Sequence, residues 1–272
     1  MEINVGALLE TMLRNFIFSG LLLSLLACSE GQPESKATGG KILPEPEPSL
    51  PVVSIGDIKP PEGYKRIAAD PASFASWLRD IPLKKDKSVY LYNGKLKPNQ
   101  SAQFAVLDIS VGKKDLQQCA DVVMRFRGEY LFAQKKYADI AFMDYAGKWY
   151  KWLGRDNRPS FDNYLQTVFG WCGSASLEKQ LKPVKNFNDI KAGDVFVQGG
   201  FPGHAMIVVD VAVSEKGKKV FMLVQGYQPA QDIHVVVNTM NGTLSPWYEI
   251  TDEEDIITPE WRFTKSNLKT WE

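Results

Sequence analysis

The chain has 272 residues, and its 32 Lys and Arg balance 32 Asp and Glu, so the formal net charge at pH 7 is zero. This balance excludes the broad basic field typical of nucleic-acid-binding proteins. With only 3 Cys and 2 His in the sequence, a zinc cluster is not favoured, and we expect neither a metal nor another cofactor.

The N-terminal residues have the pattern of an export signal that is cleaved. Arg14 precedes a short apolar run, "NFIFSGLLLSLLAC", which is too short to span a membrane. Leu25-Leu26-Ala27-Cys28 resembles the lipobox of bacterial lipoproteins, in which the cysteine is lipidated. The resemblance implies a signal peptide at 1–27 and an anchor in the lipid bilayer through acylated Cys28. Ser29, in place of a retention aspartate, then favours the outer membrane. An ordinary secretory signal is the alternative.

Residues 28–51 are rich in Glu, Ser, Gly and Pro, which predicts a flexible tether. Residues 52–272 are expected to form one α+β domain, with an N-terminal lobe at 52–111. In that lobe the sequence predicts a short helix at 73–83 capped by Ser73, a hairpin at 88–97 turning at Asn93-Gly94, and an extended segment at 103–111. The lobe has too few apolar residues for a separate core, so we expect it to pack on residues 112–272.

The core begins with a helix that carries a cysteine. Between Asp115 and about Ala133 apolar residues recur at helical spacing, and Asp115 followed by Gln118 resembles a capping box. If Asp115 is the cap, Cys119 lies in the first helical turn. Further helices are predicted at 161–169, capped by Ser160, and at 174–181.

After Pro183 the pattern changes to short apolar strands. They are predicted at 193–200, 204–213, 219–227 and 233–238. Helices followed by a run of strands indicate an α+β domain, with the cysteine helix packed on an antiparallel sheet or small barrel. His204 opens the second of these strands, and Gln225 lies near the end of the third.

The stretch "GDVFVQGGFPGHAMIVVD" and the helix-borne cysteine resemble the NlpC-like branch of the papain-like cysteine peptidases. In that branch a cysteine starts a helix, a histidine opens a strand, and a polar residue on the next strand orients the histidine. The resemblance implies a catalytic triad of Cys119, His204 and Gln225, with a helical segment inserted between the first two. Through "LQQCADVVMRFRGEYL" and "PAQDIHV" the chain is also similar to a bacterial family called domain of unknown function 4846, which supplies no activity.

The triad residues would divide the chemistry of a thiol enzyme. A thiolate is the nucleophile, and a helix N-terminus and a nearby imidazolium lower the pKa of the thiol. Gln225 would hold the imidazole in one tautomer. The backbone N–H of Cys119, with the side chain of Gln117 or Gln118, could bind the oxyanion.

Three polar residues near the last strand, Gln231, Asp232 and His234, are predicted to line a cleft with His204, or else to form only a turn. Cys172 is a rival nucleophile, since it too precedes a helix. We prefer Cys119, because Cys172 lies in a loop between helices, where a small residue is ordinary. A disulfide between the two cysteines would exclude thiol catalysis.

The sequence therefore predicts a lipid-anchored cell-envelope cysteine amidase or peptidase. Its substrate would be a peptide or amide bond of the cell wall, in peptidoglycan or another envelope glycopeptide. The alternative is a non-catalytic envelope lipoprotein that binds a glycan or peptide in the same cleft. The aromatic run at 145–154, "YAGKWYKWLG", suits stacking on sugar rings or a place in a core.

Overall fold

The computed structural model describes residues 52–272. The predicted signal peptide, the lipidation at Cys28 and the tether lie outside the described residues. The described part belongs to one compact unit, Ser49–Glu272. Within that part, no helix combines the length and the apolar character that crossing a membrane requires.

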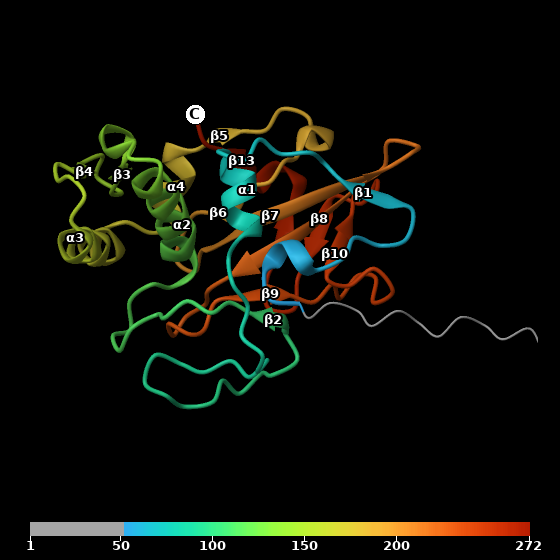
Figure 1. The fold of residues 1–272 in the computed structure, drawn as a ribbon, viewed down its shortest axis with the longest axis horizontal. Coiled ribbons are helices and arrows are strands. Elements are labelled where there is room, and N and C mark those ends of the chain that lie inside the picture. The colour runs from blue at the N-terminus through green and yellow to red at the C-terminus, as the bar shows by residue number, and fades with distance from the viewer. Residues whose placement is uncertain (1–51) are drawn as a thin grey trace, which may run out of the picture. The chain divides into compact units, whose positions relative to one another are not determined.

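A 9-stranded antiparallel sheet forms the centre of the fold (Figure 1). Its main path runs through β2 (Gln103–Val106), β9 (His234–Val236), β8 (Lys219–Gln225), β7 (His204–Ser214), β6 (Val195–Gln198), β13 (Leu268–Thr270) and β5 (Lys182–Pro183). Two further strands join it, β1 (Tyr64–Arg66) on β7 and β10 (Trp247–Glu249) on β8. Two hairpins stand apart, β3 (Ala141–Met143) with β4 (Trp149–Lys151), and β11 (Asp255–Ile257) with β12 (Arg262–Thr264).

The α-helices are α1 (Phe74–Arg79), α2 (Cys119–Ala133), α3 (Arg158–Trp171) and α4 (Ser174–Gln180), and single 3₁₀ turns lie at Ile55–Asp57, Tyr137–Asp139, Phe187–Asp189 and Lys265–Asn267. The α+β class with a large antiparallel sheet is therefore confirmed. Ser73 caps α1 as predicted, because its hydroxyl accepts from the Ser76 N–H at 3.2 Å.

The predicted cap of the third helix is wrong. The cap of α3 is Asn157, whose side-chain oxygen accepts from the Ser160 N–H at 3.0 Å. The earlier start follows from Pro159, because proline is well suited to the first turn of a helix. The hairpin at 88–97 turns at Gly94, with φ +81°, as predicted. An antiparallel bridge between Tyr90 and Leu96 and a backbone hydrogen bond from Lys97 to Val89 at 2.9 Å hold it together.

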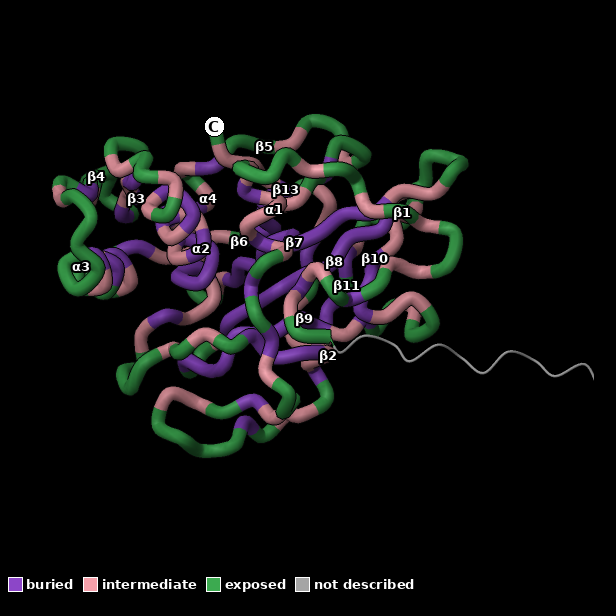
Figure 2. The backbone as a smooth tube through the Cα atoms, viewed as in Figure 1, coloured by how far each residue is buried: buried purple, intermediate pink, exposed green. Residues whose placement is uncertain are grey.

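The sheet separates two apolar clusters because side chains alternate along each strand. On β7, Ala205 and Ile207 pack with α2 in the larger cluster, whereas Met206 and Val208 face the smaller one. Both faces are thus covered, and β7 and β8 are buried along most of their length (Figure 2). This long apolar run explains why residues 204–213 are recognisable as a strand from the sequence alone.

The N-terminal lobe shares the central sheet instead of standing beside it. Its strand β1 pairs with β7, and β2 pairs with β9. Asp210 on β7 is fully buried and forms ion pairs with Arg66 at 2.5 Å and Arg79 at 2.7 Å. A buried carboxylate held by two guanidinium groups ties both elements of the lobe to the sheet. That residues 52–111 cannot fold alone stays a prediction.

Candidate active site

The N-terminus of α2 places Cys119 as the first residue of the helix. The cap residue is Gln118, and its N–H donates to the Asp121 carboxylate at 2.8 Å. The predicted cap, Asp115, is therefore wrong. The Asp115 carboxylate instead accepts from the Ala230 N–H at 2.7 Å and from the Gln118 side chain at 3.0 Å. It thus joins the loop after β8 to the start of the helix.

Gly226 lets α2 approach the end of β8. A Cβ atom at this position would lie 2.7 Å from a methyl carbon of Val122 and 3.2 Å from the Gln118 carbonyl oxygen. Real Cβ atoms do not approach a carbon this closely, so only glycine fits without a shift of the helix. Gly226 directly follows Gln225. The first turn of α2 therefore lies against the strand end that carries the predicted orienting residue.

The Cys119 thiol is half-buried, and it is a free thiol, as is that of Cys172. Burial raises the pKa of the Cys119 thiol to about 11, although the backbone N–H of Ala205 acts to lower it. The expected low pKa is therefore wrong for the resting structure. Removal from water outweighs the favourable position at the helix N-terminus, so the thiol is protonated at neutral pH.

Slow alkylation is the expected result for both cysteines. At pH 7.5, iodoacetamide should label Cys119 more slowly than glutathione, because so little of a thiol with a pKa of about 11 is ionised. Cys119 should still react before Cys172, which is buried and whose pKa burial raises to about 12. Mass spectrometry of tryptic peptides over time measures both rates. Labelling of Cys172 first would make it the accessible thiol and the better nucleophile candidate.

The structure joins His204 and Gln225 directly. They lie on the neighbouring antiparallel strands β7 and β8, and His204 Nε2 is 3.0 Å from Gln225 Oε1. Both side chains are buried. The His204 ring shares its face of the sheet with Trp261 and Phe263, at ring-centroid distances of 5.1 Å and 5.8 Å.

The remaining contacts of Gln225 determine which way its amide points. Its Nε2 lies 3.0 Å from His234 Nε2 and donates to the Glu260 carboxylate at 2.8 Å. A carboxylate only accepts hydrogen bonds, so the amide nitrogen must face Glu260 and the amide oxygen must face His204. His204 then carries its proton on Nε2, which leaves Nδ1 as the basic nitrogen.

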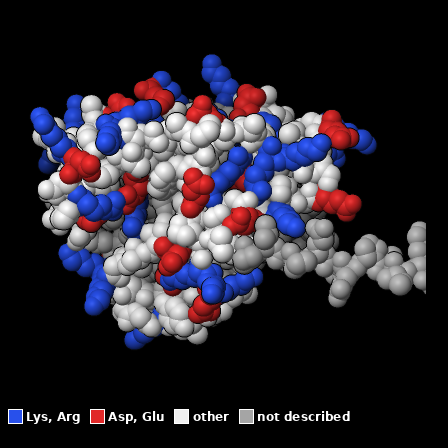
Figure 3. Space-filling view, in the orientation of Figure 1, with Lys and Arg blue, Asp and Glu red and all other residues white. Residues whose placement is uncertain are grey.

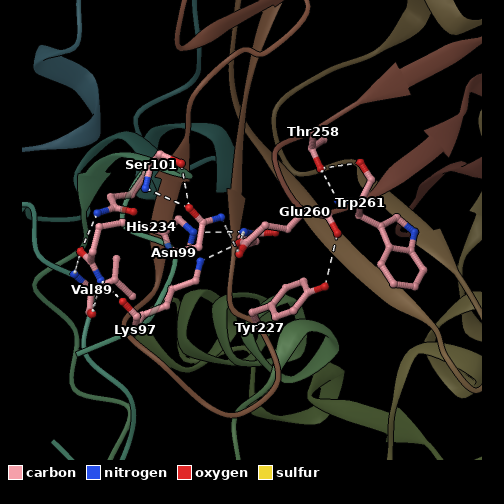
Figure 4. A network of polar contacts seen from close by, with 12 residues as sticks. Val89, Lys97, Asn99, Ser101, Tyr227, His234, Thr258, Glu260 and Trp261 are labelled. Carbon is pink, nitrogen blue, oxygen red and sulfur yellow. Dashed lines mark hydrogen bonds and ion pairs between the residues drawn. The ribbon is translucent and has the colours of Figure 1, made fainter. Parts of the chain in front are cut away.

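Glu260 is held in turn by residues of the N-terminal lobe (Figure 4). Lys97 Nζ lies 2.6 Å from the Glu260 carboxylate, and Asn99 donates to it at 3.2 Å. The side chains of Lys97 and Glu260 are only 5% and 12% exposed. The chain of contacts therefore runs from a buried ion pair through Gln225 to the imidazole of His204.

Both histidines are neutral at pH 7. Burial lowers the pKa of His204 to about 4, against the opposing effect of its hydrogen bond to Gln225. Burial likewise lowers the pKa of His234 to about 4. The Nδ1 atom of His234 lies 2.9 Å from the Asp232 carbonyl oxygen, to which it donates, so His234 Nε2 accepts from Gln225. The lowered pKa makes neutral His204 a weaker base than an exposed imidazole.

The free energy of unfolding should fall as the pH falls. The pKa of His234 is about 4 in the folded chain against an ordinary 6.5, so the unfolded chain binds more protons between these values. Asp121, whose pKa burial raises to about 7, acts in the opposite direction. Comparison with His234→Gln isolates the effect of this histidine. Between pH 7 and about pH 4.5, the free energy of unfolding of the wild type should fall by about 2 kcal/mol more than that of the variant. Urea unfolding followed by fluorescence measures this, and parallel curves would contradict a neutral, buried His234.

Cys119 and His204 face opposite sides of the sheet. Cys119 packs with Ala205 in the larger apolar cluster, whereas His204, the neighbour of Ala205 on β7, points to the face that carries Phe263. The Tyr227 ring centroid lies 5.1 Å from that of His204, and charge on Cys119 is among the causes that raise the pKa of Tyr227. Within residues 52–272 the structure gives no hydrogen bond between the thiol and the imidazole. The pairing of nucleophile and base stays a prediction.

The predicted oxyanion residues have other partners at rest. The Gln118 amide donates to Asp115. The Gln117 side chain is buried and accepts from Arg125 at 2.5 Å, while its Nε2 has no partner among residues 52–272. The backbone N–H of Cys119 lies beside its own thiol. Its role as an oxyanion donor stays a prediction.

The residues predicted to line a cleft are instead inside the protein. Gln231, Asp232 and His234 are 1%, 7% and 0% exposed. Asp232 forms an ion pair with Lys84 at 2.8 Å, and His234 bonds to Gln225. They hold neighbouring segments together. Among them only Gln231 has a buried donor without a partner.

Sequence reasoning missed Glu260, Lys97 and Tyr227. Lys97 and Glu260 are 163 positions apart, and neither lies in a periodic pattern. The segment "TPEW" that contains Glu260 looks like an ordinary turn. Within the described residues, no group of three or more Cys, His, Asp or Glu side chains could hold a metal ion.

The comparisons with known proteins identify a family. A family model described as "Domain of unknown function (4846)" matches residues 56–154 and 146–270. No curated protein and no solved structure matches the chain.

Proposed function

We propose that the chain, which belongs to the family described as domain of unknown function (4846), is a cysteine hydrolase of amide or peptide bonds. The family description carries no activity, so the proposal rests on the site. Cys119 is the nucleophile, His204 is the general base, and Gln225 orients His204. The fold would be papain-like and NlpC-like, with the cysteine helix α2 packed on the sheet that carries the other two residues.

The contact that carries this proposal is the one between His204 Nε2 and Gln225 Oε1, at 3.0 Å. It reproduces the role of the third residue in a triad, which holds the base in one tautomer. The contact is itself oriented by Glu260, which accepts from the same amide.

The pKa values indicate how the reaction would begin. The pKa of the thiol is raised to about 11 and that of the imidazole is lowered to about 4, so both groups are neutral at rest. The His204 side chain would first have to turn toward the face of the sheet on which α2 packs. His204 Nδ1 then takes the thiol proton while sulfur attacks the carbonyl carbon. The imidazolium returns this proton to the leaving amine as the C–N bond breaks. Water, activated by the same imidazole, then hydrolyses the thioester and restores the thiol.

The backbone N–H of Cys119 would bind the oxyanion, and a side chain such as Gln118 would add to it if it left Asp115. The substrate that the sequence predicts is a peptide or amide bond of the cell wall. Anchoring through acylated Cys28 at the outer membrane would bring the enzyme close to peptidoglycan. These points rest on the sequence and are part of the proposal.

Digestion of purified cell-wall peptides tests the proposal. Incubation with the full chain should produce fragments that gain one water per cleavage, with a new amine and a new carboxylate, as measured by mass spectrometry. A Cys119→Ala sample treated in the same way is the control for contaminating enzymes. Identical products with the variant would contradict the proposal.

One observation favours a second function. The resting site contains no thiolate–imidazolium pair, as the raised pKa of Cys119 and the lowered pKa of His204 show. A non-catalytic envelope protein that binds a peptide or glycan would also have these values. It would retain the wall peptides in a pull-down without changing their masses, and Cys119→Ala would bind as the wild type does.

A further inference from the structure

A cavity of about 430 Å³ lies between the segment that leads into α2 and the helix α3. One of its walls is Gln117, two residues before Cys119. Apolar side chains of α3, including Leu165 and Phe169, form part of the opposite wall. The volume is that of a small-ligand site, and mixed polar and apolar walls are typical of such sites.

The cavity is positively charged. Its lining contains four cationic side chains, Lys113, Lys114, Arg125 and Arg158, and a single acidic one, Asp162. Glu129 lies next to the two arginines and forms ion pairs with both. Lysines 113 and 114 have no acidic partner among these residues. Figure 3 shows Lys and Arg side chains in blue around the edge of the molecule where α3 lies in Figure 1.

Gln117 is the second feature that indicates a ligand. Its side chain is 4% exposed, and its Oε1 accepts from Arg125, but its Nε2 donor has no partner within the described residues. Its backbone has a φ of +64°, which is unfavourable for a residue with a side chain. An unsatisfied buried donor and a strained backbone both cost free energy, and such features are concentrated at functional sites. Nε2 is closed off from solvent at rest, so an acceptor in the cavity would satisfy it after a small shift of the Gln117 side chain.

We propose that this cavity binds the carboxylate end of a short peptide. Gln117 Nε2 and the two lysines donate to the carboxylate, and Leu165 and Phe169 contact the aliphatic part of the terminal residue. A carboxylate fits better than a neutral amide because it only accepts hydrogen bonds and carries the opposite charge. The binding itself follows from the cavity alone. That the bound peptide is the substrate of Cys119 rests on the proposed function.

Isothermal titration calorimetry with the full chain tests this site. The probes are N-acetyl-dialanine, its C-terminal amide and inorganic phosphate. The acid should bind at least about tenfold more tightly than the amide of equal size. Equal affinities would overturn the proposal. Phosphate that binds as tightly as the acid would overturn the peptide assignment, because it would reveal a general anion site.

Gln117→Glu is the sharpest variant. The new carboxylate keeps the contact with Arg125, so the fold should be retained, which thermal unfolding verifies. It replaces the unpartnered Nε2 donor of Gln117 by a negative charge, so affinity for the acid should fall at least about tenfold. Unchanged affinity in a folded variant would overturn the site.

A matched pair of double variants tests the lysines. Lys113→Gln/Lys114→Gln should weaken binding of the acid by roughly tenfold. Lys216→Gln/Lys218→Gln makes the same change in net charge at the exposed turn after β7 and should leave binding unchanged. Equal losses of affinity in the two double variants would mean that binding of the acid depends only on net charge. Cys119→Ala should bind the acid like the wild type, so a failure of catalysis and a failure of this site give different results.

Discussion

Cys119→Ala and His204→Ala should each reduce hydrolysis of wall peptides by roughly 10⁴- to 10⁶-fold, because each removes one half of the acylation step. The double variant should be no worse than either single one, since the two groups act in the same step. Initial rates of release of new amines measure the effect. Circular dichroism and thermal unfolding show whether each variant is folded.

Two further variants, Cys172→Ala and Gln225→Ala, are compared with Cys119→Ala and His204→Ala. Cys172→Ala should retain full activity, because this thiol is buried at the end of α3. Gln225→Ala should reduce the rate of hydrolysis less than His204→Ala does, because it removes only the group that orients the imidazole. Full activity of Cys119→Ala would remove this residue from the mechanism. If only Cys172→Ala lost activity, Cys172 would be the nucleophile instead of Cys119.

Lys97→Met should reduce the free energy of unfolding by about 3–5 kcal/mol. Lys97 and Glu260 form a buried pair at 2.6 Å, so the substitution leaves the carboxylate without its cation. The methionine occupies a similar volume, which limits the effect of a cavity. Because Glu260 orients Gln225, the variant should also lose activity. Urea unfolding at pH 7 measures the change in stability.

The double variant Lys97→Met/Glu260→Gln should recover most of the lost stability, because it buries no uncompensated charge. Arg262→Met breaks the exposed pair with Asp255 and should have no measurable effect, since such pairs are screened by water. A loss below about 1 kcal/mol in Lys97→Met would show that the pair does not hold the site together.

Much of the secondary structure follows from local pattern. The strands β6 to β9 lie within the predicted apolar segments, and α2 and α4 are helices where the spacing indicates them. The caps were less predictable. Asp115 has the residue type of a cap, but its carboxylate accepts from the Ala230 N–H, which comes from a loop far away in the sequence. A backbone donor from another segment competes with the local cap for the carboxylate. The sequence around Asp115 does not show that this donor is close in space.

The sequence by itself determined the α+β class, the position of Cys119 in the first turn of a helix, and the neighbouring strands that carry His204 and Gln225. These depend on periodicity and on short-range turn signals, which are local properties. Their roles were proposed from the resemblance to the NlpC-like peptidases, which the order of the three residues fits.

Only the tertiary structure decided the protonation state of the site. Burial raises the pKa of Cys119 and lowers that of His204, and burial is a property of everything that packs around a group. The tautomer of His204 depends on Gln225, whose amide is oriented by Glu260, which is paired with Lys97. These contacts join segments more than a hundred residues apart, so they exist only once the sheet has brought both ends of the domain together.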